Sequence, residues 1–332
     1  MNRERIAILL DTLDRLRVAA AIPGMVIAVV HNARAPFLAG LGYANLKTRQ
    51  DVTPNTPFRI ASLTKPIAAT LALRLQQDGI LDIHDPMSSF EGFDAFCAQA
   101  KLSPSIFFAD WNCDDPELTL QHLLSMTSNG IPGARFFYNP VAFSWTSRPM
   151  AERAGTSFSD LIQEHIFTPA GMNNSARVHR ALSLRPDLAA TLARPYRIEN
   201  TGLAVESSRP QPQGDGAGGG TISTASDLAA FDIALDKGKL ISDAARQQMW
   251  ASPAPNIPYG LGWYVKHFRE VKLVWHTGLW EERYSALYLK APTKRYSMIL
   301  LANSDGLNWP SRFDEANIED SLFAQAFLDW LD

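Results

Sequence analysis

The sequence contains few cysteines, no long apolar run and no cluster of basic residues. Two cysteines among 332 residues are too few for a framework of disulfides. Cys97 and Cys113 fall in one loop-like region, so they form either a single bridge, which an oxidising compartment would permit, or two buried free thiols. No apolar stretch approaches the ~20 residues that a helix needs to cross a bilayer, so we expect no membrane span.

Concentrated positive charge and metal-binding spacing are absent as well. The net charge is -3, and lysine and arginine do not gather in runs, which argues against a nucleic-acid partner. The 7 histidines form neither an H-x-x-x-H nor an H-E-x-x-H pattern. We therefore expect no metal and no organic cofactor, and a small molecule as the partner.

The N-terminal segment, M-N-R-E-R-I-A-I-L-L-D-T-L-D-R-L-R, carries charges among its apolar positions. It lacks the continuous apolar core of a signal peptide and predicts an amphipathic helix instead. The compartment stays open, because the protein is periplasmic if a leader was removed from this chain and cytoplasmic otherwise. The oligomeric state stays open too.

Strand-like runs gather at the two ends of the chain, and helical patterns lie between them. This order predicts an α/β (α+β) fold, in which an antiparallel sheet flanked by N- and C-terminal helices carries an inserted all-helical lobe. We expect one domain over residues 1–332, with an α/β lobe formed by 1–58 and 218–332 and a helical lobe formed by 59–217. A cleft between two such lobes is a natural place for a site.

Local patterns place the individual elements. A turn at Asn32 and Ala33 joins two strands into a hairpin, and residues 84–117 and 195–220 are predicted to be irregular, the first with a short helix. The expected strands cover 25–31, 36–43, 262–267, 271–276, 284–290 and 296–303, and the expected helices cover 62–77, 118–126, 141–154, 158–167, 224–235, 242–250 and 314–331.

The stretch Ser62-Leu63-Thr64-Lys65 stands where a turn-forming segment gives way to a long helical pattern. If Ser62 opens that helix, Lys65 lies one turn later on the same face, and its amine forms a proton acceptor beside a nucleophilic hydroxyl. Unpaired N–H groups at a helix N-terminus favour the negative charge that develops when a serine attacks a carbonyl. The alternative is a serine that only caps the helix, because S-x-x-K also occurs by chance.

Further segments support the catalytic interpretation. In chain order they are I-P-G-M-V-I-A-V-V, T-P-N-T-P-F-R-I-A-S-L-T-K-P, L-Q-H-L-L-S-M-T-S-N-G-I-P, I-F-T-P-A-G-M, G-G-G-T-I-S-T-A-S-D-L, Y-G-L-G-W and W-H-T-G. With them the chain resembles the serine β-lactamase and penicillin-binding-protein superfamily over nearly its whole length. It is most similar to the class C-like branch, which includes family VIII carboxylesterases, D-aminopeptidases and DD-peptidases. The resemblance implies a β-lactamase/transpeptidase-like fold and a hydrolase that forms an acyl-enzyme on Ser62.

The same resemblance aligns Tyr138 with the tyrosine of the Y-x-N motif of this branch. It implies that the phenol takes the proton from Ser62 and passes it to the leaving group, helped by the nearby Lys65 ammonium. A tyrosine of the core or of a loop is the alternative. Pro140 stands where the family has asparagine, and Asn139 sits one place early, so Asn139 binds a substrate amide only if the loop is shifted.

His276-Thr277-Gly278 stands in place of the family's K-T-G, on a predicted strand that lines the cleft. Gly278 would let the substrate backbone approach. By resemblance, the N–H groups of Leu279 and Ser62 form the oxyanion hole. His276 would either orient the catalytic tyrosine or bind a substrate carboxylate when protonated, and its alternative is an ordinary strand-end histidine.

Two further features lie near these motifs. The run Gly214 to Gly220 lacks a G-K-[ST] ending, and we interpret it as a flexible loop that leads into the sheet near the site. Phe136, Phe137, Trp145 and Trp280 are either the wall of an aromatic pocket or parts of the core.

The sequence therefore predicts a serine hydrolase that acts on a small-molecule ester, amide or lactam. A carboxylesterase-type or peptidase-type enzyme of the β-lactamase family is the first expectation. The alternatives are a class C-like β-lactamase or DD-peptidase of weak activity, and a non-catalytic module like a penicillin-binding sensor.

Overall fold

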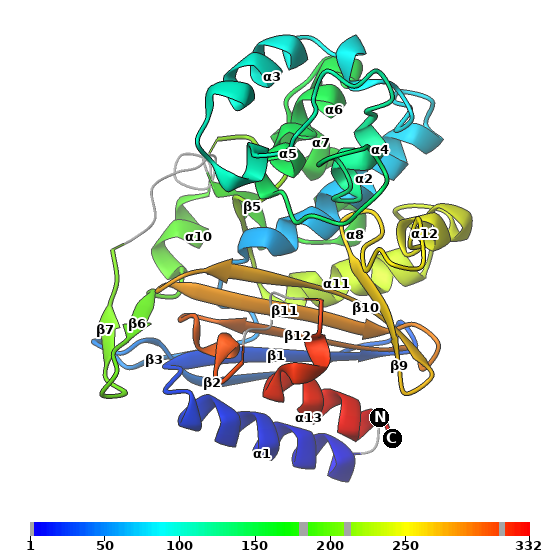
Figure 1. The fold of residues 1–332 in the computed structure, drawn as a ribbon. Helices are drawn as coiled ribbons and strands as arrows, with labels where there is room; N and C mark the ends of the chain where they lie inside the picture. The colour runs from blue at the N-terminus through cyan, green and yellow to red at the C-terminus, as the bar shows by residue number, and fades with distance from the viewer. Residues whose placement is uncertain (1–2, 179–184, 209–213, 312–315) are drawn as a thin grey trace.

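The computed structural model describes residues 3–178, 185–208, 214–311 and 316–332 (Figure 1). Its centre is the antiparallel sheet that the sequence predicts, formed by β1 (Gly24–His31), β2 (Phe37–Asn45), β3 (Gln50–Asp51), β9 (Tyr264–Phe268), β10 (Val271–Trp280), β11 (Tyr284–Ala291) and β12 (Tyr296–Ala302). The strand order is β3-β2-β1-β12-β11-β10-β9. The first strands of the chain thus pair with the last ones, with the register running from Met25↔Ala302 to His31↔Tyr296.

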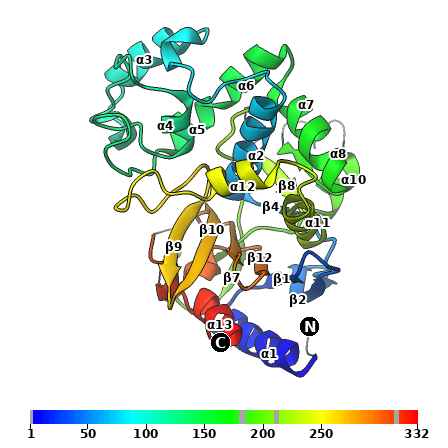
Figure 2. The same cartoon turned by 90° about the vertical axis from the view of Figure 1, so that its right-hand side faces the viewer.

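Helices cover both faces of this sheet (Figures 1 and 2). The two terminal helices, α1 (Arg3–Ala19) and α13 (Leu322–Leu331), lie side by side on one face, and α11 (Ala225–Asp236) lies on the other. Because neither face meets water, the central strand β1 is a continuous apolar run, and all of its residues except the last are buried.

The first helix is amphipathic, as its sequence predicts. It buries Ile6, Leu9 and Leu13, which the helical repeat places on one side. Within the part of the chain that the structure describes, no helix combines the length and the apolar character that a membrane crossing requires.

The last helix is shorter than predicted. It is preceded by a 3-10 turn, η6 (Ile318–Asp320), and the Ser321 hydroxyl accepts a hydrogen bond from the Ala324 N–H at 3.4 Å, which caps the helix there. The predicted start at residue 314 is therefore wrong, although residues 314 and 315 themselves lie outside the described residues.

A group of helices stands above the sheet in Figure 1 and is inserted between the two sets of strands. The predicted helix 141–154 is interrupted at Thr146, and the predicted connection 84–117 contains a helix of 10 residues, α3. The group consists of α2 (Thr64–Gln77), α3 (Phe93–Leu102), α4 (Leu120–Leu124), α5 (Pro140–Trp145), α6 (Ser147–Ala154), α7 (Phe158–Ile162), a π-helical turn (Gln163–Phe167) and α8 (Thr168–Ala170).

Small strands connect this group to the main sheet. One sheet has the order β4-β8-β5, from β4 (Phe58–Arg59), β8 (Thr221–Ser223) and β5 (Ala176–Arg177). The remaining elements are α10 (Pro186–Thr191), α12 (Asp243–Met249) and the 3-10 turns η1 (Ala61–Leu63), η2 (Met87–Ser89), η3 (Ile106–Phe108) and η5 (Gly306–Asn308).

The segment 195–220 is not wholly irregular, contrary to the prediction. It contains a hairpin of β6 (Tyr196–Ile198) and β7 (Ala204–Glu206), and the Tyr196 N–H donates to the Asn303 carbonyl at 2.8 Å, beside the end of β12. The hairpin thus contacts the main sheet, although it falls within the range 59–217 expected for the helical lobe. The division into these two lobes stays a prediction.

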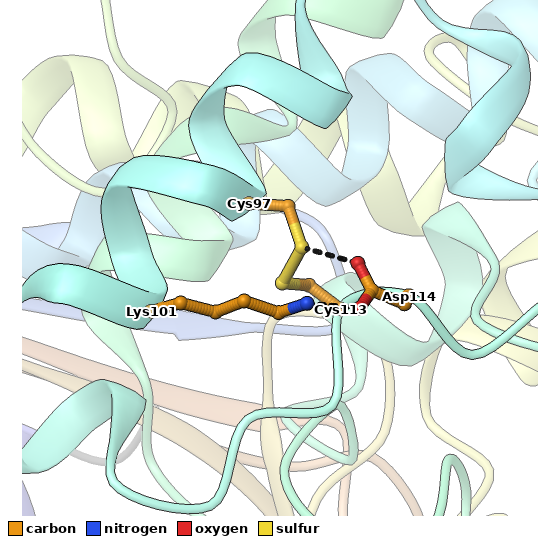
Figure 3. Close-up of a disulfide and its surroundings, with 4 residues drawn as sticks. All are labelled: Cys97, Lys101, Cys113 and Asp114. Carbon is orange, nitrogen blue, oxygen red and sulfur yellow. Dashed lines mark hydrogen bonds and ion pairs between the residues drawn. A yellow bond between two sulfur atoms is a disulfide. The ribbon is translucent and has the colours of Figure 1, made fainter.

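Cys97 in α3 is joined by a disulfide to Cys113, 16 residues later, with the Cα atoms 5.6 Å apart. Figure 3 shows Asp114 beside this bridge, with its carboxylate 3.1 Å from Cys97 Sγ and paired with the Lys101 ammonium. Of the two alternatives left open by the sequence, the structure contains the bridge. It ties α3 to the segment that follows it.

The double variant C97S/C113S should unfold more easily than the oxidised protein. The bridge closes a loop of 16 residues, and a loop of about 15 contributes about 3 kcal/mol to the free energy of unfolding. Urea denaturation of both proteins measures the difference, with the reduced wild type as control. Two titratable thiols in the native protein after oxidative refolding would contradict the bridge.

Candidate active site

Ser62 lies in the 3-10 turn η1, between β4 and α2. The helix itself begins at Thr64, so the prediction that Ser62 opens it is wrong by one short turn. The residue before the serine, Ala61, has a φ of 45°. This left-handed conformation costs a residue with a side chain about 1–2 kcal/mol. Such strain persists only where the surrounding structure imposes it, and it is common at functional sites.

Lys65 is fully buried beside this serine. Its Nζ donates to Ser62 Oγ at 2.7 Å and to the carbonyl oxygen of Gly218 at 2.9 Å. Burial disfavours the charged ammonium and lowers the pKa of Lys65 from 10.5 to about 7. A substantial fraction of the amine is therefore neutral near pH 7, and a neutral amine in contact with a hydroxyl can accept its proton.

Tyr138 lies on the other side of the same lysine. The centre of its ring is 5.1 Å from Lys65 Nζ, and the ring of Phe143 is 5.6 Å from the same atom. The Tyr138 ring is nearly parallel to that of Tyr264, which holds its plane from behind. The structure thus brings Ser62, Lys65 and Tyr138 together from three separate segments. The role of the phenol in proton transfer stays a prediction.

Ser62 opens into a cavity of about 660 Å³. The start of α5 contributes Val141 and Ser144 to its wall, the end of β10 contributes Leu279 and Trp280, and the glycine-rich run contributes four glycines from 214 to 219. The run therefore borders the site, as predicted. Of the four aromatic residues proposed for a pocket, Trp280 lines this cavity.

A second cavity, of about 700 Å³, adjoins the first and shares Val141 and Ser144 with it. Trp145 and Phe158 form apolar walls, and Arg148 supplies a guanidinium. The other proposed aromatic residues lie elsewhere: Phe136 stacks on Tyr259, and Phe137 packs edge-on against Phe107. Together the two cavities form a groove that begins at the serine.

Gly278 is required by packing and not by substrate approach, contrary to our expectation. A Cβ atom at this position would lie 2.2 Å from the carbonyl oxygen of Ile60, so β10 rests directly on the backbone that leads into the nucleophile turn. This contact brings Leu279 to the same cavity wall as Ser62. The pairing of their N–H groups in an oxyanion hole stays a prediction.

His276 is enclosed by the protein. Its Nδ1–H donates to the Thr277 carbonyl at 2.7 Å, so its Nε2 accepts the Tyr259 hydroxyl at 2.9 Å. Burial, with a smaller contribution from the Lys65 charge, lowers the pKa of His276 to about 3. The predicted role in binding a substrate carboxylate is therefore wrong, because the ring is neutral and faces away from solvent. The Thr277 side chain is buried as well.

Asn139 is also unavailable to a substrate. It caps α5: its Oδ1 accepts the Ala142 N–H at 2.9 Å, and its Nδ2 donates to the Phe107 carbonyl at 2.8 Å and to Asn129 Oδ1 at 3.0 Å. Pro140 occupies the first helical position, where a missing N–H costs little. The predicted amide-binding role of Asn139 is wrong because all of its side-chain hydrogen bonds stay within the protein.

Two groups at the site escaped the sequence analysis. The Ser144 hydroxyl accepts the Gly218 N–H at 3.1 Å, and the Gly218 carbonyl accepts from Lys65. A serine two turns into no recognisable motif carries no signal by itself. Its spacing of three residues from Val141 on a predicted helix is the one hint that both face the same way.

A metal site has little chemical basis where ligand atoms do gather among the described residues. Cys97, Cys113 and Asp114 bring two sulfurs and a carboxylate within 4.8 Å of one another. The two sulfurs are bonded to each other, so neither is the thiolate that would bind a metal.

The His276 imidazole should not titrate between pH 5 and 8, because burial keeps it neutral well below that range. Side-chain ¹⁵N NMR of the histidines across this range measures its protonation, and the H276Q variant assigns its signals. A His276 midpoint between pH 5 and 8 would contradict the enclosed, neutral ring and restore a cationic role.

Proteins of known structure share this fold. The octameric penicillin-binding protein homologue from Pyrococcus abyssi aligns with a TM-score of 0.77 at 22% identity, covering 97% of this chain and 77% of that one. The D-amino acid amidase from Ochrobactrum anthropi SV3 aligns with a TM-score of 0.76 at 19% identity, covering 98% and 99%. At these identities the likeness establishes the fold alone.

Sequence comparison extends the likeness. Penicillin-binding protein 4* of Bacillus subtilis (strain 168) is 27% identical over 320 residues, which are 86% of this chain and 66% of the relative. The chain thus spans slightly less than two thirds of the length of that relative. The model of the beta-lactamase family matches residues 10–323, almost the whole chain. The chain therefore belongs to the beta-lactamase family.

Proposed function

We propose that this protein is a serine hydrolase that forms an acyl-enzyme on Ser62. The observation that carries the proposal is the 2.7 Å contact between Lys65 Nζ and Ser62 Oγ, with the amine fully buried and the hydroxyl open to a cavity. A buried lysine is costly to a fold, and this one contacts a serine preceded by a strained residue. Nucleophilic catalysis uses both features.

The proposed reaction has two halves. In the first, Ser62 Oγ attacks the substrate carbonyl carbon while its proton passes to Lys65 and Tyr138, and the Ser62 and Leu279 N–H groups hold the oxyanion. The bond to the leaving alcohol or amine then breaks, and the leaving group takes that proton. In the second half, water attacks the acyl-serine ester, its proton goes to the same groups, and Ser62 recovers its hydrogen as the acid leaves.

We infer that esters are the preferred substrates. Binding a penicillin-like molecule would use a donor for its amide and a cation for its carboxylate. Asn139 is committed to capping α5, and His276 is neutral and buried. A simple ester presents neither group and loses nothing by their absence. The groove beyond the serine, with its Trp145 and Phe158 walls, has room for an acyl or alcohol part larger than acetyl.

A peptidase-type activity is the second candidate. The D-amino acid amidase from Ochrobactrum anthropi SV3 shares the fold over 98% of this chain, so the fold accommodates amide cleavage in at least one relative. Amides need a proton on the departing amine, which the buried Lys65 could supply. The weak class C-like β-lactamase or DD-peptidase and the non-catalytic sensor-like module complete the set that experiment must separate.

Fluorophosphonate should add once to Ser62, and the S62A variant should not react, because the adduct forms on the activated hydroxyl. Intact mass spectrometry measures the adduct. Steady turnover should follow the order p-nitrophenyl esters, then D-alanyl p-nitroanilide, then nitrocefin, and should fall by about 10³-fold or more in S62A. Acylation of the wild type without turnover on any of these substrates would favour the sensor-like module. No adduct at all would exclude the proposal.

The rate of ester hydrolysis, kcat/KM, should rise with pH through a midpoint of about 7, because Lys65 accepts the serine proton only as a neutral amine. A midpoint near 10 would contradict a buried amine acting in this way. The K65M variant should have lost the activity while keeping the fold.

Stability provides a second measurement of the same group. Lys65 has a folded-state pKa of about 7, below the 10.5 of an exposed lysine, so between these values the unfolded chain holds a proton that the folded one lacks. Its contribution to the free energy of unfolding therefore increases as pH rises through this window. Urea denaturation at pH 7 and pH 9 should show a larger increase for the wild type than for K65M.

A further inference from the structure

Arg177, on β5, lies buried beneath the glycine-rich run that borders the site. Its Nη1 donates to the Gly219 carbonyl at 2.6 Å and to Thr221 Oγ1 at 3.0 Å, and its Nη2 donates to the Gly216 carbonyl at 2.7 Å. The planar guanidinium thus spans two carbonyls of one short loop. A lysine presents a single point of donation and could not hold both.

A buried guanidinium is expensive, so its placement needs a reason. The nearest carboxylate, Asp215, has its Oδ1 at 3.6 Å from Arg177 Nε, beyond hydrogen-bond range, and it accepts the Ser159 N–H at 3.1 Å. Burial lowers the pKa of Arg177 to about 10, which leaves it charged at neutral pH. Loop carbonyls therefore provide most of the short contacts that offset the loss of water.

Gly218 lies between the two carbonyls that Arg177 holds, and it contacts the site directly. Its carbonyl accepts Lys65 Nζ at 2.9 Å, and its N–H donates to Ser144 Oγ at 3.1 Å. A Cβ atom here would lie 2.4 Å from Ser144 Oγ and 3.0 Å from the Pro140 carbonyl oxygen. The loop is thus pressed against α5 on one side and tied to Arg177 on the other.

We propose that Arg177 is a positioning residue for Lys65. By holding the carbonyls of Gly216 and Gly219 it fixes the Gly218 carbonyl, which in turn keeps the lysine amine against Ser62 Oγ and closed off from water. The contact chain needs no catalytic assumption, whereas its effect on turnover rests on the proposed function of Ser62.

Removing the guanidinium should change Lys65 in a defined direction. The groups that face its amine are the Ser62 hydroxyl, the Gly218 carbonyl, the rings of Tyr138 and Phe143, and the neutral His276. The shift in the pKa of Lys65 comes from burial, so a loosened loop that admits water should raise that pKa toward 10.5. Less of the amine is then neutral at pH 7, and its geometry is poorer.

The test compares wild type with R177A. Side-chain NMR of ¹³Cε-labelled lysine, with K65M to assign the signal, measures the Lys65 titration midpoint without any substrate. We expect a higher midpoint in R177A. The rate of fluorophosphonate acylation at pH 7 should fall by about 100-fold, as for a misplaced catalytic group. Guanidinium at millimolar concentration should restore part of the rate, and ammonium at the same concentration should not.

R194M is the matched control, because Arg194 pairs with Glu206 and does not contact the loop. It should leave both the midpoint and the acylation rate unchanged. If R177A does not fold, as judged by circular dichroism, R177K is measured instead and should show the same changes without rescue. An unchanged or lower Lys65 midpoint in the folded variant would overturn the inference. If the wild type does not acylate, the proposed function fails, and the midpoint alone still decides the role of Arg177.

Discussion

The amine of Lys65 is held out of water against the hydroxyl of Ser62, and much of the surrounding structure serves this contact. A buried amine is unfavourable, because its charged form loses hydration. The protein offsets the loss with one carbonyl, one hydroxyl and two aromatic rings around the nitrogen. The outcome is a lysine whose pKa lies near 7, where it can exchange a proton with the serine. Dry surroundings and reactivity are here the same property.

The wall of the site is made from segments that are far apart in the chain. The nucleophile turn rests against β10 through Gly278, α5 presses on the glycine-rich run through Ser144, and that run is tied from below by Arg177. Each contact involves backbone on at least one side. Backbone positions are harder to displace than the ends of side chains, so a rigid support for the lysine results.

The two residues expected to meet substrate polar groups have turned into the protein. His276 hydrogen-bonds to Tyr259 and to its neighbour's carbonyl, and Asn139 caps the helix that begins at Pro140. Both are satisfied where they are, and releasing either would leave a buried partner without its hydrogen bond. The site that remains is a serine, a lysine and a tyrosine at one end of a groove with mostly apolar walls, which suits an uncharged ester better than a charged lactam.

Local pattern was enough to predict the sheet of first and last strands, the amphipathic first helix and the Ser62–Lys65 pair, because alternation, helical spacing and a three-residue separation are properties of adjacent residues. The sequence by itself also determined that Asn-Pro would suit a helix start, although we assigned that asparagine to substrate. Tertiary structure alone decided that His276 is neutral and that Arg177 lies under Gly216 and Gly219. Burial and partners arise when distant segments pack, and nothing in the letters around a histidine or an arginine records which carbonyls will close over it.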